Sequence, residues 1–436
     1  MTSGTSFRVG IDGYNLAIPR GTGVATYARS LAACVTALGH PVDVLYGMDI
    51  DPETPAIEQQ VAFFDQLQTE RGYKRPPYPS LRWARLMAGA WRGRTATPIA
   101  LDGRVDPRPV AERLPQHDRI LNTQTLFGLA AHFFRTFNRF VEVRIPDPPA
   151  LMHWTYPVPV RLAGARNVYT VHDLVPLRMP YATLDHKPTH MRLLRECLRS
   201  GHVCTVSERS REDLFSFFPD ADRDKVINTY QAVPQPPAPR DPAETERLLA
   251  EGFGLRPGGY FLFFGSVEPK KNVARLLQAF LQTDITLPLV LVTARTWQSG
   301  PEAALLNDRP AGDRRLRQID YVPQATLATL IAGARAVTFP SVYEGFGLPV
   351  LEAMQAGTPV LTSHEGSLAE VAGDAAEIVD AFDVDSIAAG LRRLATDDAR
   401  CAELRARGLH QAERFSMAQY RPRVRALYDH VMARPR

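Results

Sequence analysis

The chain has 436 residues, of which 45% are hydrophobic and 22% are charged. This composition is close to the globular average and excludes wholesale disorder, and the length favours two or three domains. The formal net charge of +4 is modest for this length and gives no reason to expect a nucleic-acid partner.

Short apolar runs alternate with helical patterns along most of the chain. Runs of four to eight residues rich in Val, Ile, Tyr and Phe are typical of strands buried on both faces of a parallel sheet. Helices are expected between many of them, including residues 22–38 and 274–282. The alternation over two halves predicts two doubly wound α/β domains. The predicted strands cover residues 7–12, 42–47, 150–154, 167–173, 202–207, 225–230, 260–266, 288–293, 319–322, 336–341, 360–363 and 376–380.

A proline-rich stretch separates the two halves. Residues 231–242 contain five prolines, a density that stops helices and strands and marks a linker. Residues 50–150 have proline-rich stretches and few clean strands, so we expect an insertion with some helices there. The predicted organisation is therefore a first domain over residues 1–238, a second over 239–415 and a final segment over 416–436, helical over 418–432.

Three strand-end segments of the first half could approach a ligand. Asp12-Gly13-Tyr14-Asn15 and Gly21-Thr22-Gly23 lie between the first strand and a helix. The third glycine and the ribose-binding acid of a dinucleotide fingerprint are missing, and an ordinary strand-to-helix turn is the alternative. His172 ends a later strand, where it could bind a substrate hydroxyl or be structural. Ser207, at the next strand end, is expected to cap a helix.

The strongest motif lies in the second half, over Pro340–Met354. A strand end leads through a glycine-bearing loop into a helix with Pro349 in its first turn. Backbone N–H groups at such a helix start suit a diphosphate. Glu344 and Glu352 bracket this turn and would suit sugar or ribose hydroxyls. The alternative is a helix-start acid beside turn glycines.

A second strand-end segment of this half, Gly265–Asn272, carries Lys270 and Lys271. Two lysines at the carboxyl edge of a sheet would meet a phosphate as point charges. A solvated surface pair is the alternative.

Taken in chain order, these motifs resemble the retaining glycosyltransferases of family 4, and within it bacterial polysaccharide mannosyltransferases. The resemblance covers roughly residues 7–48 and 150–432, and the pair Glu344 and Glu352, spaced Glu-x7-Glu, carries it most specifically. It implies the GT-B fold, an α/β architecture of two Rossmann-like domains facing each other across a cleft. The final helix would return to the first domain.

The resemblance also implies site residues. His172 would touch the donor sugar near the reacting carbon, Lys271 would neutralise the diphosphate, and Glu344 would hold the sugar; these three would be catalytic. Glu352 would hold the ribose, and Val322 would lie near the base. The full set of implied donor-binding residues is Gly21, Thr22, Gly23, Ser266, Val322, Gly345, Phe346, Gly347, Leu348 and Glu352.

The implied reaction moves a sugar from a nucleotide sugar to a saccharide or lipid-linked acceptor in polysaccharide biosynthesis, without metal or cofactor. Mannose from GDP-mannose is a frequent donor in this family. One position departs from the family pattern, because Ser266 stands where many members carry Arg. Lys270 and Arg295 are the candidates to replace that charge.

Two other classes of function compete with this interpretation. An NAD-dependent oxidoreductase or epimerase needs the glycine fingerprint and the ribose acid, and both are missing. A non-catalytic saccharide-binding protein would have no reason to keep Lys271, Glu344 and Glu352 at phosphate-binding positions.

The net charge is concentrated in one segment. Residues 71–119 contain 11 Lys and Arg against four Asp and Glu, with Tyr73, Tyr78, Trp83 and Trp91 among them. Basic residues with interfacial aromatics suit an anionic membrane surface, and a solvated basic loop is the alternative.

The four cysteines are too sparse for a disulfide framework, and Met1–Arg8 shows no secretory signal. We therefore expect a cytoplasmic protein, peripheral at the inner face of the membrane.

Overall fold

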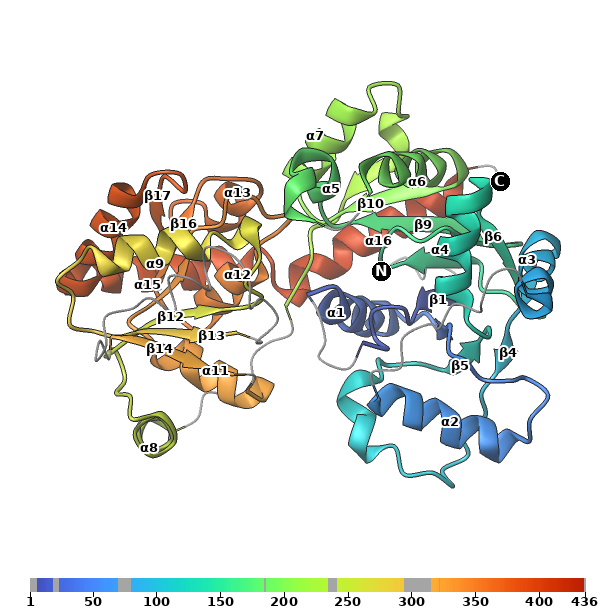
Figure 1. Ribbon diagram of the computed structural model, residues 1–436, viewed down its shortest axis with the longest axis horizontal. Coiled ribbons are helices and arrows are strands. Elements are labelled where there is room, and N and C mark those ends of the chain that lie inside the picture. The colour runs from blue at the N-terminus through green and yellow to red at the C-terminus, as the bar shows by residue number, and fades with distance from the viewer. Residues whose placement is uncertain are drawn as a thin grey trace. The chain divides into compact units, whose positions relative to one another are not determined.

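The chain forms two compact units, described here from a computed structural model (Figure 1). Unit 1 comprises residues 1–180, 184–232 and 420–436, and unit 2 comprises residues 181–183 and 233–419. The predicted boundary at residue 238 lies outside the described residues. The structure describes residues 6–18, 23–69, 80–183, 186–233, 241–293, 315–320 and 322–434.

Unit 1 is built on an eight-stranded sheet in the order β11-β10-β9-β7-β1-β2-β5-β4. Every neighbouring pair is parallel except β4 with β5. The central strands are almost wholly buried, as a parallel sheet covered on both faces requires. The strands are β1 (Val9–Asp12), β2 (Val42–Tyr46), β4 (Thr97–Pro98), β5 (Arg119–Asn122), β7 (Leu151–Trp154), β9 (Arg166–Val171), β10 (His202–Thr205) and β11 (Val226–Asn228).

Helices connect these strands, and a short parallel sheet, β3-β6-β8, lies beside them. Ser207 accepts a hydrogen bond from the Ser210 N–H and caps α7, which confirms the predicted cap. The short strands are β3 (Arg94–Thr95), β6 (Val141–Arg144) and β8 (Val160–Leu162). The helices are α1 (Gly23–Ala37), α2 (Ala56–Gln68), α3 (Leu81–Arg92), α4 (Leu126–Phe137), α5 (Val175–Arg178), α6 (Lys187–Ser200), α7 (Glu208–Phe217) and the 3-10 turns η1 (Arg108–Arg113), η2 (Pro180–Ala182) and η3 (Arg223–Lys225).

Residues 50–150 are more regular than the sequence predicts. β5 pairs in parallel with β2 and so extends the main sheet, and α4 follows it directly. The reason for the missed strand is its composition, because Arg119-Ile-Leu-Asn122 has only two apolar residues between polar ends. Most of the segment is therefore part of the unit 1 fold.

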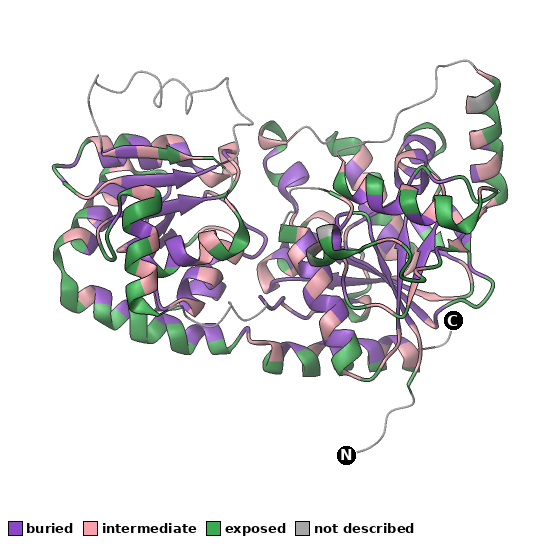
Figure 2. Ribbon diagram, turned by 90° about the horizontal axis from the view of Figure 1, so that it is seen from below, coloured by how far each residue is buried: buried purple, intermediate pink, exposed green. Residues whose placement is uncertain are grey.

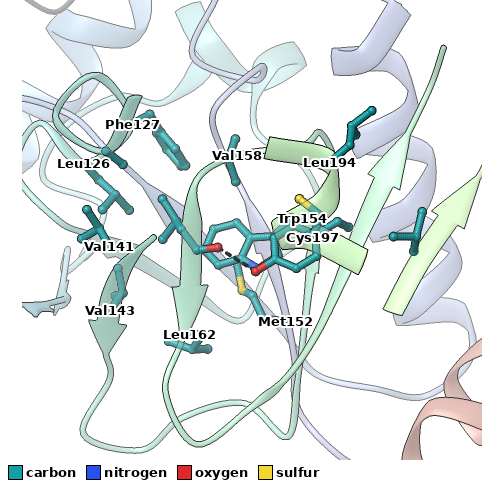
Figure 3. Close-up of a cluster of buried hydrophobic side chains, with 14 of the residues drawn as sticks. Leu126, Phe127, Val141, Val143, Met152, Trp154, Val158, Leu162, Leu194 and Cys197 are labelled. Atoms are coloured by element: carbon teal, nitrogen blue, oxygen red, sulfur yellow. Dashed lines mark hydrogen bonds between the residues drawn. The ribbon is translucent and has the colours of Figure 1, made fainter. Parts of the chain in front are cut away.

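The core of unit 1 joins α4 and the short sheet to the main sheet. Trp154 of β7 is completely buried, and its indole N–H donates to Asn167 Oδ1 at 2.9 Å. Figure 3 shows the cluster around it, which draws side chains from both sheets and from α4 and α6. Labelled members are Leu126, Phe127, Val141, Val143, Met152, Trp154, Val158, Leu162, Leu194 and Cys197.

The last helix, α16 (Met417–Ala433), places residues from Tyr420 onward in unit 1. The Tyr428 hydroxyl lies 2.9 Å from Nδ1 of the buried His153. Burial lowers the pKa of His153 to about 3, with a further contribution from His172. The helix is thus fixed to β7 by a hydrogen bond to a neutral imidazole as well as by its apolar face.

Unit 2 contains a six-stranded, fully parallel sheet in the order β14-β13-β12-β15-β16-β17. The parallel α/β architecture predicted for both halves is confirmed. The strands are β12 (Phe261–Phe264), β13 (Leu289–Val292), β14 (Leu316–Ile319), β15 (Ala336–Phe339), β16 (Val360–Ser363) and β17 (Glu377–Val379). The helices are α8 (Pro242–Phe253), α9 (Val273–Leu281), α11 (Gln324–Gly333), α12 (Leu348–Gln355), α13 (Leu368–Ala372), α14 (Val384–Thr396), α15 (Asp398–Glu413) and the turn η4 (Pro269–Lys271).

Aspartates begin three of these helices. The carboxylates of Asp241, Asp383 and Asp397 accept hydrogen bonds from backbone N–H groups in the first turns of α8, α14 and α15.

Within the described ranges, no helix is long and apolar enough to cross a membrane.

Candidate functional site

The unit 2 sheet reverses its winding direction between β12 and β15. The chain runs from β12 outward to β14, then returns to place β15 on the other side of β12. Ligands of doubly wound sheets bind at such a switch point, outside the carboxyl ends of the strands. The two segments that follow these strands are Gly265–Asn272 and Pro340–Gly347, the two motifs singled out in the sequence.

Hydrogen bonds hold the two segments together. The Val342 N–H donates to the Lys270 carbonyl at 2.9 Å. Asn272 donates its side-chain amide to the carbonyls of Pro340, at 2.9 Å, and Ala381, at 2.6 Å. Asn272 has a φ of +60°, a left-handed conformation that Asn tolerates better than most residues. The buried asparagine thus ties η4 to the loop that follows β15.

Lys271 and Glu344 form an ion pair across this switch point. The Lys271 ammonium lies 2.6 Å from Glu344 Oε1, and the two side chains are only 13% and 8% exposed. The ammonium also lies 4.6 Å from the centre of the Phe339 ring, at the end of β15. A cation and a carboxylate in this enclosed position interact more strongly than a surface pair does. This geometry argues against the solvated-pair interpretation of Lys271.

The backbone of Glu344 is fixed by a segment that sequence reasoning missed. The Ser367 N–H and hydroxyl each donate to the Glu344 carbonyl at 3.0 Å. Gly366 has a φ of +62°, and a Cβ there would lie 2.5 Å from that same carbonyl oxygen. The only sequence signal was a Gly-Ser pair shortly after the strand that ends at Ser363.

The start of α12 completes this edge of the sheet. Gly347, at φ +99°, precedes the first helical residue, Leu348, and Pro349 occupies the first turn as predicted. The Phe346 ring is buried 5.4 Å from Phe415, so only the backbone of Phe346 is left to face a ligand. The loop and first turn therefore present backbone amides and the positive end of the helix dipole.

Glu352 lies one turn into α12 and differs from Glu344. Its side chain is half-buried, and no cation or hydrogen-bond donor of the described residues offsets the effect of burial on its carboxylate. Burial raises the pKa of Glu352 to about 7. A carboxylate removed from water without a partner is costly. Ligand hydroxyls would supply the missing donors.

The remaining unit 2 predictions fall on the same strand ends. Ser266 follows β12 and donates to Glu268 Oε1 at 2.6 Å, so its hydroxyl is already engaged within the loop. Val322 follows β14 and is half-buried. Lys270 lies in η4 next to Lys271. Arg295 lies outside the described residues.

Unit 1 has its own switch point, between β1 and β7. His172 follows the adjacent strand β9, and its Nε2–H donates to the Thr155 carbonyl at 2.8 Å. The Thr155 N–H, at the end of β7, in turn donates to the carboxylate of Asp12, at the end of β1. The imidazole also packs edge-on against Tyr27, with ring centres 4.9 Å apart.

Asp12 is the buried acid in this series of hydrogen-bonded residues in unit 1. It is completely buried and accepts hydrogen bonds from the N–H groups of Thr155 and Tyr14. Burial nevertheless raises the pKa of Asp12 to about 6.

Gly23 is the first residue of α1, whereas Gly21 and Thr22 lie outside the described residues. The predicted site residues are thus divided, with His172 and Gly23 in unit 1 and the other described ones in unit 2.

Comparison with known proteins places these motifs in a family. Residues 256–411 match the family described as Glycosyl transferases group 1. The chain is 38% identical over 257 residues to the O-antigen chain mannosyltransferase B of Escherichia coli, covering 58% of this chain and 67% of that protein. It is 29% identical over 274 residues to the serotype-specific mannosyltransferase WbdA of Escherichia coli, covering 61% of this chain but only 33% of WbdA.

Solved structures of low sequence identity share the fold. Sucrose-phosphate synthase from Thermosynechococcus elongatus matches with a TM-score of 0.64 at 16% identity, covering 98% of this chain and 99% of that one. WaaG, a glycosyltransferase involved in lipopolysaccharide biosynthesis, matches with a TM-score of 0.60 at 14% identity, covering 98% and 100%. Anabaena HepE, solved with UDP and glucose, matches with a TM-score of 0.63 at 13% identity, covering 97% and 99%. The fold is GT-B, as the sequence motifs predicted.

Proposed function

Because the chain belongs to the group 1 glycosyltransferases, we propose that it transfers mannose from GDP-mannose to a saccharide or lipid-linked acceptor in polysaccharide biosynthesis. The observation that carries the proposal is the enclosed Lys271–Glu344 pair at the β12/β15 switch point. Two relatives, an O-antigen chain mannosyltransferase and a serotype-specific mannosyltransferase, support mannose as the sugar.

In this proposal the diphosphate of the donor lies at the start of α12. Backbone amides of Gly345–Leu348 and the positive helix end stabilise its charge, and Lys271 adds a full cation. The charge on the leaving diphosphate grows as the sugar–phosphate bond breaks, so Lys271 stabilises the transition state more than the ground state. These groups do the work that a divalent metal does elsewhere, and the proposal requires no metal or cofactor.

Two carboxylates recognise hydroxyl groups of the donor. Glu344, fixed by Ser367, accepts hydrogen bonds from the sugar. Glu352, which has no donor among the described residues, accepts them from the ribose. Val322 lies near the base. Ser266 and Gly347 contribute to the walls of the donor site. The proposal does not include a second cation in place of the arginine that many family members carry at the position of Ser266.

The acceptor reacts on the face from which the diphosphate leaves, so the anomeric configuration is retained. The departing phosphate takes the acceptor proton, and no enzyme nucleophile is needed. From the resemblance to the family, we assign His172 to the donor sugar near the reacting carbon and Gly21, Thr22 and Gly23 to its phosphates. The enzyme works in the cytoplasm, peripheral at the inner membrane face.

A donor-hydrolysis screen over GDP-mannose, GDP-fucose, UDP-glucose and UDP-galactose tests the proposal. We expect release of mannose from GDP-mannose and protection from thermal unfolding by GDP but not by NAD. Proton NMR of a mannosylated acceptor should show the α-anomer. Hydrolysis of none of the four donors, or protection by NAD instead of GDP, would contradict the assignment.

A further inference from the structure

The arginines of residues 71–119 do not form one uniform basic surface. Arg104 and Arg108 pair with the neighbouring Asp102 and Asp106, and Arg119 pairs with Asp43 and Asp147. These ion pairs cancel much of the positive charge in the second half of the segment. Residues 71–79 lie outside the described residues.

Helix α3 has two distinct faces. Trp83, Leu86, Met87 and Ala90 turn inward and pack against the unit 1 core, and the Trp83 indole N–H donates to His132 of α4 at 3.2 Å. The opposite face repeats at helical spacing and is exposed. It consists of Leu81, Ala84, Arg85, Ala88, Trp91 and Arg92.

Two large apolar side chains of this outer face are exposed. Leu81 is 67% exposed and Trp91 is 47% exposed. Trp91 packs against Phe133 and Phe137 of α4, with ring centres 5.4 and 5.3 Å apart, and Phe137 is itself 36% exposed. Figure 2 shows α3 at the outer edge of unit 1, with a ribbon that is mostly green and pink. The outer face of α3 and the adjoining end of α4 thus form one continuous surface.

The charge of this surface is entirely positive. Residues 80–101 and 119–141, which include both helices, contain no Asp or Glu. Arg85, Arg92, Arg135 and Arg139 are exposed, and the Arg139 guanidinium lies over the Trp91 ring at 4.5 Å. The nearest acid on the adjoining strand β6, Glu142, is already paired with Arg144 and Arg161.

We propose that this α3–α4 surface, defined by Leu81, Arg85, Trp91, Arg92, Arg135, Phe137 and Arg139, docks on an anionic lipid bilayer. A helix with an aromatic and aliphatic outer face flanked by arginines matches the interface between headgroups and acyl chains, where tryptophan is favoured. The uniformly positive charge matches anionic lipid headgroups. The proposal rests on the proposed function for its purpose, since a lipid-linked acceptor is presented at such a surface. The proposed membrane-binding surface thus differs from the segment 71–119 expected from the sequence, because it includes residues of α4.

Vesicle sedimentation with the full chain tests the proposal. We expect binding to vesicles of equal parts phosphatidylglycerol and phosphatidylcholine, weakening in 0.5 M NaCl, and little binding to phosphatidylcholine alone. Arg85→Gln/Arg92→Gln should weaken binding about 25-fold, from about fivefold for each arginine at an anionic surface. Arg104→Gln/Arg108→Gln removes the same charge from paired positions and should change binding less than about twofold.

A second matched pair tests the apolar contribution. Trp91→Ser should weaken binding severalfold. Phe382→Ser, which changes a 57% exposed ring of unit 2 that also lies beside an arginine, Arg275, should not. Circular dichroism melts check that all variants stay folded. Equal losses in both arginine pairs, equal losses at Trp91 and Phe382, or wild-type binding that ignores lipid charge would each overturn the proposal.

GDP-mannose hydrolysis in buffer without vesicles separates this proposal from the proposed function. Docking predicts that Arg85→Gln/Arg92→Gln hydrolyses the donor at the wild-type rate while losing vesicle binding. A wild-type protein that binds anionic vesicles but hydrolyses no nucleotide sugar would sink the proposed function and leave the docking surface intact. A wild-type protein that hydrolyses GDP-mannose but binds no vesicles would overturn the docking surface and leave the proposed function intact.

Discussion

The two switch points of this chain treat a buried carboxylate in opposite ways. In unit 2, Glu344 faces the ammonium of Lys271 at 2.6 Å. In unit 1, Asp12 is completely buried and is held by the backbone N–H groups of Thr155 and Tyr14. The first arrangement places two full charges near the start of a helix, whereas the second places a single charge at a strand end, linked to His172 through the backbone of Thr155.

This difference suggests two roles. The charge of Lys271 is placed to bind a ligand, whereas the charge of Asp12 is placed to fix the backbone next to His172. In the proposed donor site, Lys271 would bind the diphosphate directly, because the lysine can exchange part of its interaction with Glu344 for one with the phosphate. Asp12 instead fixes the backbone whose carbonyl accepts the His172 Nε2–H. Substitution of Lys271 should therefore change mainly the turnover rate. Substitution of Asp12 should change mainly the stability and its dependence on pH.

The largest expected effect is at Lys271. In the proposed mechanism Lys271→Ala removes a donor to the developing diphosphate charge, so kcat should fall at least about a hundredfold, and Glu344→Ala should do the same. Steady-state rates of GDP-mannose hydrolysis measure both. A purified Lys271→Ala protein with wild-type rates would refute the role.

A double variant separates catalysis from folding at this pair. Lys271→Met alone leaves the nearly buried Glu344 without its cation and should lower the urea midpoint, whereas Lys271→Met/Glu344→Gln removes both charges and should recover stability. Turnover should stay at least about a hundredfold down in both. Recovery of turnover together with stability would make the pair structural only.

The second largest effect is at Asp12. Its pKa is raised from 3.8 to about 6, so the folded state binds this proton more tightly than the unfolded state does. Stability is therefore greatest while Asp12 is protonated and falls as the pH rises from about 4 to about 6, by up to about 3 kcal/mol. Urea denaturation of the wild type across this range should show that decline.

Asp12→Asn supplies the control for this titration. The amide keeps an acceptor for the Thr155 N–H but carries no charge, so its stability should vary less over the same pH range. If the wild type and Asp12→Asn show the same pH profile, the carboxylate is already satisfied by its two backbone donors and the comparison with Glu344 loses its basis.

The sequence predicted the members of the unit 2 pair because their positions follow from topology. Lys271 and Glu344 each lie a few residues after a buried apolar strand, and parallel strands place their carboxyl ends on one edge. Apolar runs of this kind are strong signals. The pairing itself could not be predicted, since the 2.6 Å contact depends on the loop path that Asn272 fixes through Pro340 and Ala381.

The sequence failed where a residue acts through the backbone. Nothing in the residue type of Thr155 indicates that its N–H and carbonyl link Asp12 to His172. Gly366 and Ser367 act likewise on the Glu344 carbonyl. The strand Arg119–Asn122 was missed for a different reason, because four residues with polar ends give no periodicity to detect.

Glu352 is a third kind of buried carboxylate, one that has no donor among the described residues. Its pKa is raised to about 7 by burial. If the ionised form accepts the ribose hydroxyls, affinity for GDP is full above pH 7 and is lost as the pH falls through that value. The affinity should therefore drop about tenfold between pH 8 and pH 6, measured by titration calorimetry.

Glu352→Gln isolates this effect from protonation of the nucleotide itself. The variant should bind GDP more weakly at pH 8, and its affinity should follow only the titration of the nucleotide. A tenfold pH dependence that persists in Glu352→Gln would assign the dependence to another group and remove Glu352 from the ribose site.

The smallest effect concerns how firmly Glu344 is held. Ser367→Ala removes one hydrogen bond to the Glu344 carbonyl and leaves the one from the Ser367 N–H, so it should cost about 1 kcal/mol of stability and lower kcat a few-fold. Ser363→Ala is the matched control, because its hydroxyl donates at 2.6 Å to the carbonyl of Ser341, which carries no proposed site role. Urea midpoints should fall similarly in the two variants, whereas kcat should fall only in Ser367→Ala. A parallel loss of kcat in both would mean that turnover follows the general stability of this loop rather than the position of the Glu344 carboxylate.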